Sequence, residues 1–96
     1  MRRYDNEELD RRIQELIGSD FPDRPTSDIS IALRVADFME SRGYTFRMTD
    51  QCPKSLSDCL WRAVFIASDA EYVAEDSRPA VAVCAAAVAA LEAAEA

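Results

Sequence analysis

The fold of this chain is decided by the stretch Pro79-Ala80-Val81-Ala82-Val83-Cys84-Ala85-Ala86-Ala87-Val88-Ala89-Ala90-Leu91. These thirteen uncharged residues, seven of them alanine, lie in an acidic protein of 96 residues. A membrane-spanning helix needs about 20 apolar residues, so this stretch is too short to cross a bilayer. It therefore predicts a buried helix that packs on a sheet or on a second copy of the chain.

The surroundings of this helix predict how it begins and what it packs against. Asp76 or Ser77 can cap it, and Pro79 falls in its first turn, where the missing N–H costs nothing. Apolar residues spaced three and four apart form a seam that we expect to face the sheet, namely Val81, Cys84, Val88 and Leu91. Alanines make much of the remaining surface smooth, namely Ala85, Ala86, Ala89 and Ala90. A partner could approach such a surface closely, so we expect a homo-oligomer through the last helix.

Two more helices are predicted upstream. The first has a possible cap at Asp5 and ends at Gly18, and it carries one apolar stripe of Leu9, Ile13, Leu16 and Ile17. The second begins at Thr26 or Ser27, runs to Arg42 and has Gly43 as its stop. Its apolar face is wide, which indicates contact with a sheet on one side and a further element on the other.

Three strands are predicted between the second and the last helix. Residues 44–49 alternate strictly, with Tyr44, Phe46 and Met48 expected to face the core. Residues 60–67 are nearly all apolar, as in a central strand that is covered on both faces. Residues 72–75 form a third, short strand. The order α-α-β-β-β-α predicts an α+β fold, with a small three-stranded antiparallel sheet layered between helices.

The length of the chain allows one structural domain and no second core. Within that domain we expect residues 1–25 to form an N-terminal helix and loop, and residues 26–96 to form an α/β/α sandwich. The formal net charge is −7, and acidic residues surround the arginine pairs at 2–3 and 11–12. Duplex nucleic acid is therefore not an expected partner. Ten of the eleven basic residues are arginine, so a small pocket for a phosphate stays open.

Histidine is absent, which removes the commonest general base and the commonest metal ligand. Cys84 is expected in the core, whereas a disulfide between Cys52 and Cys59 is conceivable. An odd number of cysteines and a charged N-terminus favour a reduced, cytosolic setting without membrane attachment. No cofactor or metal is expected, and no GxSxG motif supports nucleophilic catalysis.

Four motifs together resemble the phage ABA sandwich family of small phage and prophage proteins. They are Ser27-Asp28-Ile29, Arg42-Gly43-Tyr44-Thr45-Phe46, Leu60-Trp61-Arg62-Ala63-Val64-Phe65, and the segment from Pro79 to Ala87. The resemblance covers residues 26–92 and implies an α/β/α layered fold and a non-enzymatic role. Some proteins of similar build resemble Thoeris anti-defence proteins, which sequester nucleotide-derived immune signals. Members of the family often carry an arginine where this chain has Ala85, and its absence weakens the sequestration hypothesis.

Four residues are candidate ligand contacts, each with a simpler structural interpretation. Trp61 could stack on a base while Arg62 holds a phosphate, or it could pack on the last helix with Arg62 at the rim of the sheet. Arg78 could complete an anion pocket at a helix start, or it could pair with Glu75 or Asp76. Arg47 could contact a ligand or a partner from the outer face of its strand, or simply be exposed there.

Paired carboxylates are the remaining candidates for chemistry. Asp20 and Asp23 flank a Phe-Pro pair, and Asp37 and Glu40 share a helix face. Neither pair has a third ligand, and a solvated face is the expected interpretation. We therefore expect a non-enzymatic phage or prophage accessory protein that sequesters a nucleotide-like ligand. The alternative is a protein–protein interaction module that inhibits a host factor, and a small hydrolase is a third class.

Overall fold

The computed structural model describes residues 6–17, 26, 28–50, 60–68 and 70–95. These residues form six elements, namely α1 (Asn6–Ile17), α2 (Ile29–Ser41), β1 (Thr45–Asp50), β2 (Trp61–Ile66), β3 (Glu71–Asp76) and α3 (Pro79–Glu95). The predicted order and the α+β class are confirmed. Each predicted strand agrees with the structure to within one residue at either end. Asp5, Gly18, Cys52 and Cys59 lie outside the described residues, so the predictions that involve them stay predictions.

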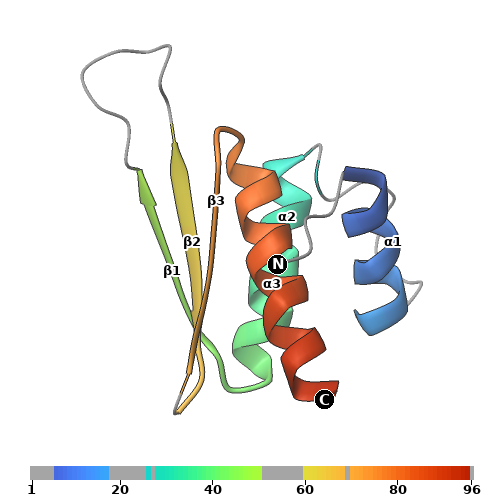
Figure 1. Ribbon diagram of the computed structural model, residues 1–96, viewed down its shortest axis with the longest axis vertical. Coiled ribbons are helices and arrows are strands. Elements are labelled where there is room, and N and C mark those ends of the chain that lie inside the picture. The colour runs from blue at the N-terminus through green and yellow to red at the C-terminus, as the bar shows by residue number, and fades with distance from the viewer. Residues whose placement is uncertain (1–5, 18–25, 27, 51–59, 69, 96) are drawn as a thin grey trace.

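The three strands form one antiparallel sheet in the order β1-β2-β3. In its middle row Arg47 pairs with Val64, and Val64 pairs with Val73. Figure 1 shows α2 and α3 together on one side of this sheet, with α1 on the far side of α3. The layering therefore differs from the expected sandwich, because among the described elements no helix lies on the other side of the sheet. Within the described part of the chain, the sheet is thus an outer layer with one face uncovered.

Helix α3 is the centre of the molecule, because it contacts β2, β3, α2 and α1. Ten of its residues are buried, namely Ala80, Val81, Ala82, Val83, Cys84, Ala86, Ala87, Val88, Ala90 and Leu91. The alanine methyl groups keep the helix narrow, so that neighbours can pack on several of its sides at once. Of the alanines expected to face a second subunit, Ala86 and Ala90 are fully buried within the chain, and Ala89 is exposed. Most of these alanines therefore pack within one chain, and little of their surface is exposed to a second subunit. The homo-oligomer through α3 stays a prediction.

Helix α1 packs on α3 with its apolar stripe, of which Leu9 and Ile13 are buried and Leu16 and Ile17 are partly buried. Leu9 and Ile13 are 2% and 0% exposed. Beside them, Asp10 accepts two hydrogen bonds from Thr26, one from the backbone N and one from Oγ1, both 3.0 Å long. α1 therefore shares the core that α2, α3 and the sheet also form.

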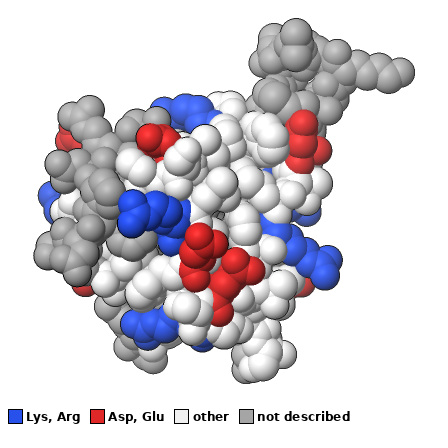
Figure 2. Space-filling model, turned by 180° about the vertical axis from the view of Figure 1, so that it is seen from behind, with Lys and Arg blue, Asp and Glu red and all other residues white. Residues whose placement is uncertain are grey.

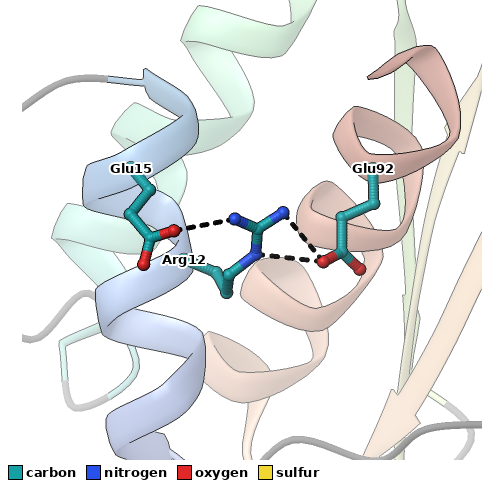
Figure 3. Close-up of polar contacts among 3 residues, drawn as sticks. All are labelled: Arg12, Glu15 and Glu92. Carbon is teal, nitrogen blue, oxygen red and sulfur yellow. Dashed lines mark hydrogen bonds and ion pairs between the residues drawn. The ribbon is translucent and has the colours of Figure 1, made fainter. Parts of the chain in front are cut away.

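A half-buried arginine also joins α1 to α3. Arg12 donates from Nη1 to Glu15 Oε2 over 2.8 Å and from Nε to Glu92 Oε2 over 3.0 Å (Figure 3). The hydrogen bond to Glu15, followed by that to Glu92, raises the pKa of Arg12 above its ordinary value. The guanidinium is thus held between one carboxylate of its own helix and one of the central helix.

The start of α2 lies two to three residues later than predicted. Asp28 is the N-cap, and its side chain accepts a hydrogen bond from the backbone N of Ser30 over 2.9 Å. Thr26, which was expected to begin the helix, instead donates its hydroxyl and its N–H to Asp10. At the other end Gly43 has a φ of 97°, the left-handed conformation typical of the residue after a helix, so the predicted stop is confirmed.

The start of α3 is anchored by Asp76 rather than by Ser77. Asp76 Oδ1 accepts a hydrogen bond from the backbone N of Arg78 over 2.9 Å, and the carbonyl of Arg78 accepts the bond from the backbone N of Ala82. Pro79 follows as the first helical residue, as predicted. Among the described residues, no helix has both the length and the apolar character needed to span a membrane.

Candidate binding surface

Strand alternation divides the side chains of the sheet between two faces. On the inner face, Tyr44, Phe46, Met48, Trp61, Tyr72 and Ala74 pack against the buried core, together with the buried Ala63 and Phe65. The prediction for Tyr44, Phe46 and Met48 is confirmed. The opposite face, which we call the outer face, carries Thr45, Arg47, Thr49, Arg62, Val64, Ile66, Glu71, Val73 and Glu75.

The proposed pair of Trp61 and Arg62 is divided by this alternation. Trp61 is half-buried and packs against the core on the inner face. Arg62 is exposed on the outer face, where its Nε lies 3.0 Å from Glu75 Oε2 on the neighbouring strand. Because the two side chains point to opposite sides of the sheet, they cannot together stack on a base and hold its phosphate.

The neighbours of Trp61 are also unfavourable for an anion. In the sheet register Trp61 pairs with Asp50 on one side and with Asp76 on the other. All three belong to the same row of the inner face, so an incoming phosphate would meet two carboxylates next to the indole. The arrangement therefore disfavours a nucleotide phosphate beside Trp61.

Arg78 lies directly before α3, at the helix start where it was predicted. Its Nε is 3.4 Å from Asp76 Oδ1, the oxygen that also accepts the backbone N–H of Arg78. A carboxylate thus already accepts the backbone N–H of Arg78 and lies beside its guanidinium, at the position that a bound anion would need. The pairing with Asp76 corresponds to the simpler interpretation of Arg78.

Arg47 is a predicted contact that lies exposed on the outer face, as Arg62 does. It is exposed in the middle of β1 on the outer face, between Thr45 and Thr49. Within the described part of the chain, no ion pair of Arg47 is observed. Arg47 therefore remains available to a partner, and Arg62 lies on the same face one row away. Arg78 and Trp61 do not lie on this outer face.

The middle of the outer face is apolar, which the sequence analysis missed. Val73 on β3 is 47% exposed, and its neighbours Val64 and Ile66 on β2 are half-buried. The continuous apolar run of β2 was interpreted as a strand covered on both faces, although only one face is covered. A usable signal was present in β3, where Val73 stands between the two acidic residues Glu71 and Glu75.

The described residues form no catalytic or metal-binding cluster. Asp37 and Glu40 are exposed on α2, whereas Asp20 and Asp23 lie outside the described residues. Within the described ranges, no three carboxylate or cysteine side chains are grouped so that they could hold a metal ion. Cys84 is fully buried, and burial followed by the nearby Asp10 raises the pKa of its thiol. This thiol is not a poised nucleophile.

Charge on the face seen in Figure 2 is mixed. Figure 2 shows the face opposite to that of Figure 1, where acidic and basic side chains lie interspersed among uncharged ones. A surface that follows a phosphate backbone would instead gather its lysines and arginines. A comparison of the chain with known protein families, with curated proteins and with solved structures finds no match. The resemblance to the phage ABA sandwich family stays a prediction.

Proposed function

We propose that this chain is a small non-enzymatic binding protein that acts through protein–protein contact, and that the outer face of its sheet is the contact surface. One observation carries the proposal, namely that the outer face is open and has a half-exposed Val73 at its edge. Two half-buried apolar residues, Val64 and Ile66, adjoin Val73, and charged side chains surround all three. An apolar centre with a polar rim is the usual anatomy of a protein interface.

This proposal takes the second of the expected functions in preference to the first. Sequestration of a nucleotide-like signal required Trp61 and Arg62 to act together, but they lie on opposite faces of the sheet. It also required a site that accepts a phosphate, whereas Asp50 and Asp76 flank Trp61. In the setting that the phage resemblance implies, the target of the outer face would be a host protein.

The experiment is a pull-down from a bacterial host lysate with three immobilised forms of the chain. The first is the wild type and the second is Val73→Lys, which places a charge on the outer face. The third is Leu33→Lys, the matched control, because Leu33 is 43% exposed on α2 and Val73 is 47% exposed. We expect a protein that the wild type and Leu33→Lys recover and that Val73→Lys loses.

Two results would contradict the proposed function. One is equal recovery of every protein by all three forms, since the outer face would then play no part. The other is heat of binding in calorimetry with cyclic ADP-ribose isomers or cyclic oligonucleotides, which would restore the sequestration hypothesis. We expect no such heat.

A further inference from the structure

The geometry of the outer face points to a specific first occupant, a second copy of this chain bound sheet to sheet around a two-fold axis parallel to the strands. The inference rests on the proposed function only in that it uses the same face. It differs from self-association through α3, whose alanines are largely buried in the chain.

Charge is distributed across the outer face from one edge to the other. The basic side lies on β1 and β2 with Arg47 and Arg62, whereas the acidic side lies on β3 with Glu71 and Glu75. Arg62 and Glu75 already form an ion pair of 3.0 Å. Arg47 and Glu71 have no ion pair within the part of the chain that the structure describes. The face thus carries one uncommitted charge of each sign, on opposite edges.

A two-fold axis along β2 brings these opposite edges together. It lays β1 of one copy over β3 of the other and β2 over β2, in the aligned packing common for two sheets. Arg47 pairs with Val64 and thereby shares a row with Val73, so it comes to lie over Val73 of the second copy. Glu71 and Glu75 of the second copy stand two residues to either side of that valine. Each arginine then faces two carboxylates, and the symmetry makes this contact twice.

The other simple two-fold arrangement is unfavourable. An axis across the strands would place β1 over β1 and β3 over β3 with their directions reversed. Arg47 would then face Arg47 of the second copy, and Glu71 would face Glu75 of the second copy. In the favoured arrangement Arg62 lies near the axis and faces Arg62 of the second copy. Its guanidinium, however, is paired with Glu75 of the same chain. The charge pattern therefore selects the axis along the strands.

The size of the face sets the strength of this contact. Six residues in a strand span about 20 Å, and three strands about 4.8 Å apart span about 10 Å between the outer two. Such a face is smaller than the roughly 800 Å² per partner of a standard interface. We therefore expect a weak, reversible dimer whose population rises with concentration.

Sedimentation of the purified chain between about 10 µM and about 1 mM tests this inference. We expect the average mass to rise towards that of two chains. Val73→Lys places a cation opposite Arg47 of the second copy, and Arg47→Glu places an anion between Glu71 and Glu75. Each should weaken the association at least about tenfold, since like charges face each other across the contact. The double variant Arg47→Glu with Glu71→Arg exchanges the two signs and should restore most of the association.

Leu33→Lys is again the control and should associate like the wild type. A wild-type chain that stays monomeric at the highest concentration overturns the inference, as does a dimer that Val73→Lys leaves intact. Failure of the double variant to regain association would reject the strand-parallel axis. These results are independent of any target. A monomer with a Val73-dependent host partner would reject the dimer alone, whereas a dimer without any host partner would reject the proposed function alone.

Discussion

At the scale of a single residue, the burial of Cys84 determines the chemistry of its thiol. It lies in the middle of the central helix with 0% of its surface exposed. Burial is the main cause that raises the pKa of its thiol, and the negative charge of Asp10 adds to it. A thiol that holds its proton so firmly cannot supply the thiolate on which cysteine chemistry depends. At this position the sulfur therefore acts as a small apolar group.

The raised pKa of Cys84 predicts a loss of stability at alkaline pH. The folded chain keeps the thiol proton above about pH 8.5, where the unfolded chain releases it, so the unfolded state binds fewer protons. The free energy of unfolding should therefore fall as the pH rises beyond that value, by up to about 1.4 kcal/mol per pH unit. Below that value the contribution of the thiol is fully present. Urea unfolding at a series of pH values between neutral and alkaline measures the slope.

Cys84→Ala is the control for this titration. Alanine is smaller and has no proton to lose, so the variant should be somewhat less stable at neutral pH. Its stability should fall less steeply above about pH 8.5, because the other titrating groups remain and the thiol does not. Parallel slopes for the two proteins would show that Cys84 ionises in the folded state.

At the scale of elements, the contacts that hold α1 on α3 can be tested separately from the rest of the fold. Ile13 is fully buried and Leu9 almost so, and Leu16 and Ile17 of the same helix are partly buried against the core. The polar contacts of Arg12 and Asp10 surround this small apolar contact. Apolar burial should dominate the docking, since exposed or half-exposed ion pairs contribute little.

Ile13→Ala should therefore lower the free energy of unfolding by about 2–5 kcal/mol, the range for removing a large apolar side chain from a core. Arg11→Ala on the same helix is the control, because Arg11 is exposed and the change should stay within about 0.5 kcal/mol. The midpoint of urea unfolding at constant m-value measures both. Equal midpoints for the two variants would mean that α1 does not share the core in solution.

Most elements could be predicted because their signals are local. The alternation of Tyr44, Phe46 and Met48 fixes which side of β1 is buried, and Gly43 marks the end of α2 by its backbone conformation. The start of α2 could not be predicted, because Thr26 is engaged by Asp10, sixteen residues away. Local propensity does not contain such a contact, so the sequence predicts a start at Thr26 or Ser27, whereas the structure uses Asp28 as the cap.

At the scale of the whole molecule, the number of layers on each side of the sheet could not be predicted. An apolar central strand is expected both in a covered sheet and in one whose open face binds a partner. The candidate site could not be predicted either, because it depends on which face of the sheet each side chain occupies. Trp61 and Arg62 are adjacent in sequence, but strand alternation places them on opposite faces. Only Arg47, and Arg62 with its ion pair, remain on the surface that we propose to be functional.

The open face also predicts that binding and folding can be separated. Val73 is half-exposed, so Val73→Lys removes little buried surface, and lysine at this edge strand stands between Glu71 and Glu75. We expect its free energy of unfolding to stay within about 1 kcal/mol of the wild type. Thermal unfolding monitored by circular dichroism, under dilute conditions that keep the chains apart, measures this. A loss of several kcal/mol would mean that Val73 belongs to the core of the single chain.

The central position of α3 has a consequence for how this protein is made. A ribosome produces α1, α2 and all three strands before it begins the helix on which they pack. At about 5–20 residues per second, the 17 residues of α3 take roughly one to three seconds to add. During that interval the inner face of the sheet lacks α3, the helix that packs on β2 and β3, and its aromatic side chains are more accessible to chaperones and proteases. The nascent chain thus passes through a vulnerable stage that only the arrival of its last helix can end.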